Sequence, residues 1–145
     1  MRDAVASLGA KMIPALRFLV VTTVFAHAIL VCAQPFLAGW SLDGDGTALD
    51  LHGGNGGIVV TLSLLLIVLG IPWWRPGGGS GRVPILATLL FAAETLQLNL
   101  GHADILVGHV PLGVGIVVTS LLLCAVSIRG SPSRPLGPAC ERNQS

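Results

Sequence analysis

Four long apolar stretches follow one another along the chain, and short segments rich in Gly, Pro and polar residues separate them. The stretches lie at about 16–39, 51–73, 84–101 and 106–128. A helix of about 20 apolar residues crosses a bilayer core of about 30 Å, so each stretch predicts a membrane-spanning helix. Short connections favour antiparallel neighbours. The pattern therefore predicts an all-α fold, an integral membrane four-helix bundle with up-down-up-down topology.

The segments outside these stretches are expected to lie in the cytoplasm. Residues 1–15 form a cytoplasmic N-terminal segment, residues 16–128 form the transmembrane domain, and residues 129–145 form a flexible cytoplasmic tail rich in Pro and Ser. The first apolar stretch is longer than the apolar part of a typical signal peptide, and no small-x-small cleavage site follows it. We therefore expect the first helix to be retained.

The positions of the basic residues predict the orientation. All 8 Lys and Arg residues fall before the first stretch, between the second and third, or after the fourth: Arg2, Lys11, Arg17, Arg75, Arg82, Arg129, Arg134 and Arg142. The other two connections carry aspartates and no Lys or Arg. The positive-inside rule therefore predicts a multi-pass protein of the cell membrane with both termini in the cytoplasm. The aromatic residues Trp40, Trp73 and Trp74 stand at the ends of the stretches, where an interfacial belt is expected.

The composition excludes several classes of protein. Hydrophobic residues make up 52% of the chain, charged residues make up 10%, and the mean hydropathy is +0.81. Soluble domains carry about 25% charged residues, so this chain is neither a water-soluble globule nor a disordered segment. No run of basic residues indicates nucleic-acid binding, and the lipid bilayer is the partner that the composition predicts.

A polar pattern repeats in the two halves of the chain. His52 is followed four residues later by Gly56, and His109 is followed at the same spacing by Gly113. The preceding apolar stretch ends with Gln34 and a Gly in the first half, and with Gln97 and a Gly in the second. The repetition predicts that the bundle is built from one two-helix hairpin used twice.

The repeat places two histidines at matched depth near the outer face, on the diagonal second and fourth helices. Two imidazoles facing each other are the axial ligands of a bis-histidine haem iron, so His52 and His109 are the candidate metal ligands. Gly56 and Gly113 lie one helical turn further on the same faces, where they would leave room for the edge of the macrocycle. The alternative is that these glycines only allow close helix packing.

Other polar residues are candidate contacts of the same site. Gln34 and Gln97 are expected to point into the outer part of the bundle. There they would contact haem propionates or the second nitrogen of a ligand imidazole, or join neighbouring helices by hydrogen bonds. His102, in the turn beside Asp104, is either solvated or a propionate donor.

His27 and Glu94 lie deeper inside their stretches. If Gln34 and Gln97 lie at the same level, His27 and Glu94 are offset by about 6 Å along the helix axes, a distance that their side chains can bridge. We therefore expect a hydrogen-bonded pair. It can serve to neutralise two buried polar groups, as part of a proton path, or as a second ligand site.

A family resemblance rests on two runs, Leu96-Gln97-Leu98-Asn99-Leu100-Gly101 and His109-Val110-Pro111-Leu112-Gly113. The chain resembles one four-helix half of heme A synthase, and related small four-helix bacterial haem-binding membrane proteins. The resemblance implies haem held by a His near the outer end of the second and fourth helices, which are His52 and His109 here. Leu49 stands where the catalytic half of that family has a Glu, and the Cys pair of the first outer loop is absent. Haem-modifying catalysis is therefore not expected, and a homodimer would restore an eight-helix assembly.

The leading hypothesis is a membrane protein that binds haem b through two histidines near the outer face. It would act in electron transfer or as an accessory subunit of a redox or haem-handling system, with a quinone or a membrane redox protein as partner. Two alternatives remain open: a small proton-coupled transporter that uses Glu94, and a structural or assembly subunit without haem.

Overall fold

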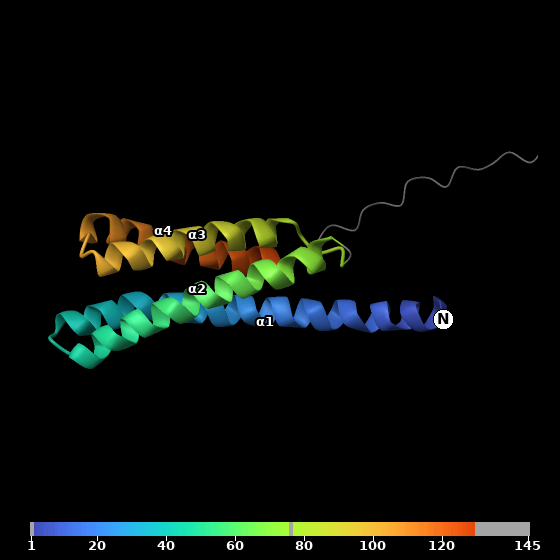
Figure 1. The fold of residues 1–145 in the computed structure, drawn as a ribbon, viewed down its shortest axis with the longest axis horizontal. Helices are drawn as coiled ribbons and strands as arrows, with labels where there is room; N and C mark the ends of the chain where they lie inside the picture. The colour runs from blue at the N-terminus through green and yellow to red at the C-terminus, as the bar shows by residue number, and fades with distance from the viewer. Residues whose placement is uncertain (1, 76, 130–145) are drawn as a thin grey trace, which may run out of the picture.

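The chain is all-helical, as predicted. The computed structural model describes residues 2–75 and 77–129, with side chains from Met12 onward. Its elements are α1 (Arg2–Leu42), α2 (Gly46–Trp74), α3 (Arg82–His102) and α4 (Leu106–Ile128) (Figure 1). Each of the four is long and apolar enough to cross a membrane. The predicted flexible tail, apart from Arg129, lies outside the described residues.

The helices are longer than the apolar stretches that predicted them, except for α4. Helix α1 has 41 residues and begins at Arg2, so the predicted N-terminal segment 1–15 is not separate from the first helix. Its first turns extend beyond the other helices in Figure 1. The hydropathy pattern marks the membrane-crossing part of a helix, whereas backbone hydrogen bonding continues until a turn residue ends it.

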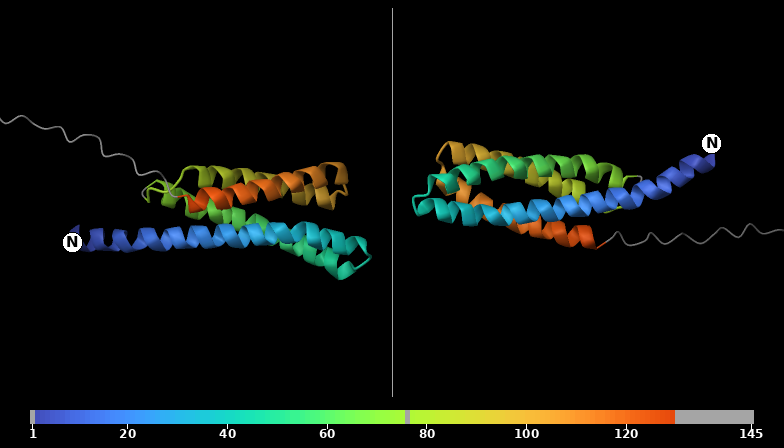
Figure 2. Two further views of the ribbon diagram at one scale, coloured as in Figure 1. Left: turned by 180° about the vertical axis from the view of Figure 1, so that it is seen from behind. Right: turned by 90° about the horizontal axis from the view of Figure 1, so that it is seen from below.

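Each helix packs against two others. Helices adjacent in sequence are in contact, and α1 also packs against α4, whereas α1 and α3, like α2 and α4, have no backbone contact. These two pairs are therefore diagonal across the bundle interior. The turns after α1 and α3 lie at one end of the molecule, here named the short-turn end, and the turn after α2 lies at the opposite end (Figures 1 and 2).

Local sequence explains where the turns fall. Asp45 caps the N-terminus of α2, because its Oδ1 accepts hydrogen bonds from the backbone N–H groups of Thr47 and Ala48 at 2.8 and 3.3 Å. Gly44 adopts a φ of +93° in this turn, which favours glycine. In the turn between α2 and α3, a Cβ atom on Gly79 would overlap the indole of Trp73.

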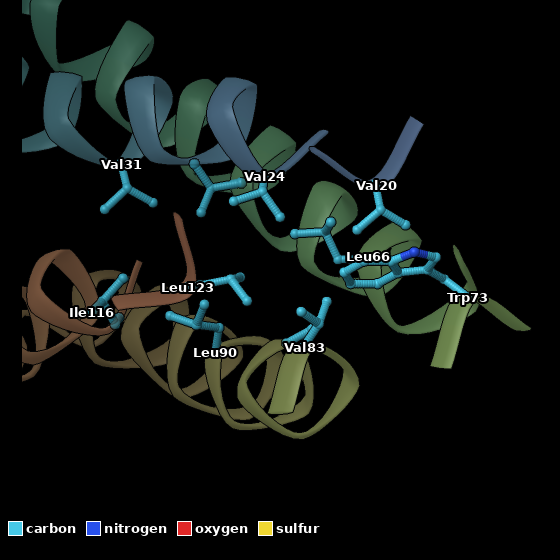
Figure 3. Packing of buried hydrophobic residues seen from close by; sticks show 11 residues of the cluster. Val20, Val24, Val31, Leu66, Trp73, Val83, Leu90, Ile116 and Leu123 are labelled. Atoms are coloured by element: carbon cyan, nitrogen blue, oxygen red, sulfur yellow. The ribbon is translucent and has the colours of Figure 1, made fainter. Parts of the chain in front are cut away.

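The apolar core fills the half of the bundle away from the short-turn end. It contains valines and leucines from all four helices that are almost fully enclosed, and Figure 3 shows their packing. Its members are Val20, Val24, Val31, Val59, Leu66, Trp73, Val83, Ala87, Leu90, Ile116 and Leu123. Since lipid is as apolar as these side chains, their close packing rather than a hydrophobic force between the helices joins them.

Trp73 differs from the other two tryptophans in its burial. Its side chain is only 3% exposed and belongs to the core, whereas Trp40 and Trp74 are exposed. All three tryptophans were predicted to lie at the ends of the apolar stretches; the enclosure of the Trp73 side chain was not predicted. The loop glycines allow the chain to fold back over its indole, which a sequence pattern of hydropathy does not reveal.

Two adjacent leucines provide a test of this core. Leu66 is fully buried, whereas the neighbouring Leu65 is 41% exposed on the outer face of α2. Leu66→Ala should lower the free energy of unfolding by about 2–5 kcal/mol, because it leaves a cavity. Leu65→Ala should have a much smaller effect, and thermal unfolding of both variants in the same detergent measures the difference. Equal losses would contradict the packing described here.

Candidate functional site

Polar side chains replace the apolar core in the half of the bundle nearest the short-turn end. In that half the apolar core stops at Val31 on α1, Val59 on α2, Leu90 on α3 and Ile116 on α4. Between these residues and the short-turn end, the described part of the chain has one buried apolar side chain, that of Ala48. The interior at this level is therefore lined by imidazole and amide groups instead of hydrocarbon.

The predicted ligands His52 and His109 are brought together across the bundle. Their ring centroids lie 6.0 Å apart, and the two ring planes are inclined by 56°. His52 is on α2 and His109 on α4, the diagonal helices that have no backbone contact. Both side chains are half-buried. The two rings therefore meet in the interior, with one helix contributing each.

Each imidazole is held by the helix that precedes its own. His52 Nδ1 lies 3.2 Å from the backbone oxygen of Gln34, and His109 Nδ1 lies 3.0 Å from that of Gln97. A carbonyl oxygen only accepts hydrogen bonds, so in both rings Nδ1 carries the hydrogen and donates it. The lone pair of Nε2 remains free on each ring. This is the arrangement that metal-bound histidines commonly have.

The glutamines contribute to this geometry differently from what the sequence predicted. One of the roles considered for their side chains was a contact with the second nitrogen of each imidazole; the backbone carbonyls of Gln34 and Gln97 make that contact. The helices lie close enough for the main chain itself to reach the rings. Every residue has a backbone carbonyl group, so this contact depends on how the helices cross and not on the presence of Gln at these positions.

The glycine that follows each histidine by four residues, Gly56 or Gly113, leaves room for a glutamine side chain. A Cβ on Gly56 would lie 3.2 Å from Nε2 of Gln34, and one on Gly113 would lie 3.0 Å from Nε2 of Gln97. The space that we predicted for a macrocycle edge therefore holds an amide group in this structure. Both amide oxygens are buried and have no hydrogen-bond partner in the described chain.

Two residues that the sequence analysis did not assign to the site also support it. Gly101, at the end of α3, lies against His109, because a Cβ there would be 3.0 Å from the ring carbon Cε1. Asn55 Nδ2 donates a hydrogen bond of 2.8 Å to the backbone oxygen of Leu30 and so joins α2 to α1. Its position three residues after His52, on the same face of the helix, was the available signal.

His102 lies apart from this arrangement. Its side chain is exposed, and Nδ1 donates a hydrogen bond of 2.7 Å to the backbone oxygen of Leu98 on its own helix. Its predicted contact with a propionate stays a prediction.

The predicted bond between His27 and Glu94 is present. His27 Nε2 and Glu94 Oε1 are 2.8 Å apart, and the two side chains are 0% and 3% exposed. The pair joins α1 to α3, the other diagonal of the bundle. The roles predicted for it, in a proton path or as a second ligand site, are a separate question.

The residues around the histidines limit which metal group they fit. No group of three or more His, Cys, Asp or Glu able to hold a metal ion occurs within the part of the chain that the structure describes. Structural zinc sites use four protein ligands and catalytic ones three. A haem iron needs only axial ligands from the protein, so two facing imidazoles fit a haem better than such a site.

Comparison with known proteins adds no family assignment. No protein-family model, curated protein or solved structure matches the chain. The resemblance to heme A synthase therefore stays a prediction from the sequence.

The hydrogen bonds predict one imidazole tautomer at both sites. In the haem-free protein, His52 and His109 should carry their hydrogen on Nδ1, because each donates to a carbonyl oxygen. Nitrogen-15 NMR of histidine-labelled protein, with His52→Ala and His109→Ala to assign the signals, measures the tautomers directly. Hydrogen on Nε2 of either ring would contradict the geometry.

The glycine contacts predict a second, independent result. Gly113→Leu should expel the amide of Gln97 and destabilise the bundle by about 1–3 kcal/mol through overpacking. Gly115→Leu is the matched control, since a Cβ there meets nothing within 4 Å. Unfolding in detergent should separate the two variants, and equal stability would show that the space at Gly113 is not restricted.

Proposed function

We propose that this chain is a multi-pass membrane protein that binds haem b through His52 and His109 and acts in electron transfer or as an accessory redox subunit. One observation carries the proposal: two half-buried imidazoles face each other at a centroid separation of 6.0 Å. Their Nδ1 atoms are already hydrogen-bonded, which leaves Nε2 of both rings available for a metal.

The separation of the rings suits two ligands on opposite sides of one metal ion. A bond from an imidazole nitrogen to a metal ion is about 2 Å long. Two such bonds in line, with the distance from each nitrogen to its ring centre added, put the centroids about 6 Å apart. The observed centroid separation therefore matches the value expected for two ligands of one metal ion.

The surrounding residues would hold and orient the ligands. The carbonyl oxygens of Gln34 and Gln97 fix the rotation of each ring, and Gly101 packs against His109. The side-chain amides of the same glutamines offer N–H donors to a polar group at the edge of the site, in a region with no Lys or Arg between Leu42 and Trp74. When bound, haem supplies reversible one-electron chemistry at its iron.

The distribution of charge supports the proposed orientation. Arg75 and Arg82 flank the turn between α2 and α3, whereas the turns of the short-turn end carry Asp43, Asp45 and Asp104. We therefore place both termini in the cytoplasm and the histidines near the outer face of an up-down-up-down bundle. The same contact, from a His Nδ1 to the backbone oxygen of a Gln, occurs once in each half of the chain. This repetition supports a bundle built from one two-helix hairpin used twice. A quinone or a membrane redox protein would then reach the site from the outer side.

An absorbance spectrum tests the proposal. Protein purified in detergent from haem-replete cells should show a strong Soret band and, when reduced, the sharp α-band of a low-spin bis-histidine haem. His52→Ala and His109→Ala should each lose this low-spin signature, because one axial ligand is removed. Asn99→Ala is the control, since this exposed amide donates to Thr95 of its own helix at 2.7 Å.

Two further measurements make the result decisive. Thermal unfolding checks that each alanine variant is folded, and added imidazole should restore the low-spin spectrum to the folded ones. His109→Met should give a haem with a raised reduction potential, because Met and His ligation has that effect. A colourless protein that takes up no haem on reconstitution would overturn the proposal.

A further inference from the structure

The pair of His27 and Glu94 has no part in holding the proposed haem, yet it is the most deeply buried polar pair of the bundle. An isolated charge at such a position would be very costly. A proton in the bond between Nε2 and Oε1 keeps the pair at zero net charge, whether it resides on the imidazole or on the carboxyl group. In both forms Nδ1 of His27 carries a hydrogen, and Oε2 of Glu94 can accept one.

His27 Nδ1 and Glu94 Oε2, the two atoms on the far sides of this bond, have no hydrogen-bond partner in the described chain. Among the described residues, four buried side-chain atoms have no hydrogen bond: His27 Nδ1, Glu94 Oε2, Gln34 Oε1 and Gln97 Oε1. All four belong to α1 and α3, the diagonal pair. Buried polar groups in proteins are nearly always hydrogen-bonded, to protein or to ordered water. These four atoms are therefore the positions in the interior where ordered water is expected to bind.

Helix geometry connects the four atoms into one column. Gln97 follows Glu94 by three residues, about 4.5 Å along α3, with no fully buried apolar residue between them; on α1, Gln34 follows His27 by seven residues, about 10.5 Å, and the buried Val31 lies between them. Residues at these spacings share a helix face. The column therefore runs from the buried pair to the level of the two imidazoles, at the short-turn end.

In the opposite direction most of the buried side chains are apolar, and the buried hydroxyls of Ser63 and Ser127 donate to carbonyl oxygens of their own helices. Val20, Val24, Leu66 and Leu123 are all fully buried on that side of the pair. Helix α2 contributes no titratable side chain between His52 and Trp74, and α4 contributes only Cys124 between His109 and Ile128. Cys124 Sγ lies 3.9 Å from the backbone oxygen of Val24, and on α1 the Cys32 thiol is exposed. His27 and Glu94 therefore depend on each other and on the column for proton exchange.

We propose that His27 and Glu94 form a proton-exchange site inside the membrane, which reaches water at the short-turn end through a hydrated column lined by Gln34 and Gln97. One proton from water forms an O–H bond at Oε2 of Glu94 while another leaves Nδ1 of His27 to water. The proton between Nε2 and Oε1 then resides on the imidazole, and the pair keeps zero net charge. This site belongs to the chain without haem and stands independently of the function proposed above.

The sequence allows a clean measurement of this exchange. Glu94 and Glu141 are the two glutamates of the chain, so Glu141→Gln protein with isotope-labelled glutamate gives an infrared carboxyl signal from Glu94 alone. The full chain is reconstituted in lipid, and H₂O buffer is replaced by D₂O. The carboxyl signal should shift much faster than the backbone amides of α1 and α3 exchange.

Variants in the column decide the route. Gln34→Leu with Gln97→Leu removes the two polar side chains that line the column and should slow the shift by at least about tenfold. Asn99→Leu is the matched control, because its amide is exposed on α3 outside the column, and it should leave the rate unchanged.

Two results would overturn the proposal. In one, the Glu94 signal exchanges no faster than the helix amides, which would make the pair a dry structural bond. In the other, the double Leu variant exchanges at the rate of the parent protein while circular dichroism shows it folded. Absence of haem from the same samples would contradict the proposed function but would not affect either reading of the exchange.

Discussion

The arrangement of this protein depends on the hydrogen bond from a histidine Nδ1 to the backbone carbonyl of the preceding helix, made once in each half of the chain. The bonds of His52 to Gln34 and of His109 to Gln97 are 3.2 and 3.0 Å long. In an apolar surrounding an unpaired polar group is costly, so each imidazole constrains the rotation of two helices. The same bond leaves Nε2 of each ring available for a ligand. The same hydrogen bonds therefore determine both the packing of the helices and the geometry of the site.

The bundle is divided into two kinds of interior along its length. Valines and leucines fill the half that contains the turn after α2, where their close packing holds the helices together. Glutamine and histidine line the other half, the pair of His27 and Glu94 lies where the two halves meet, and four atoms of these polar side chains have no protein partner among the described residues. The apolar half holds the helices rigidly together. The polar half has hydrogen-bonding atoms that remain available to a cofactor, to water or to both. A membrane bundle filled throughout by hydrocarbon would have neither.

Much of the candidate site followed from the spacing of a few polar residues. The matched positions of His52 and His109 indicated a facing pair because two helices that run in the same direction place equivalent residues at equal depth. The difference in rise between His27 and Glu94 similarly indicated their bond. Spacing did not reveal that backbone atoms of Gln34 and Gln97 bind the rings, since a carbonyl group is common to every residue. It also did not reveal that their amides occupy the room beside the two glycines.

The sequence by itself determined the all-helical class, four helices able to cross a membrane, and the polar residues that share a level, because these follow from hydropathy and helical periodicity. Tertiary structure decided which atoms meet. It enclosed the side chain of Trp73 in the core, and it set the ring centroids of His52 and His109 6.0 Å apart. These outcomes depend on helix rotation and crossing, which are fixed by contacts between all four helices at once and not by the order of residues in any one of them.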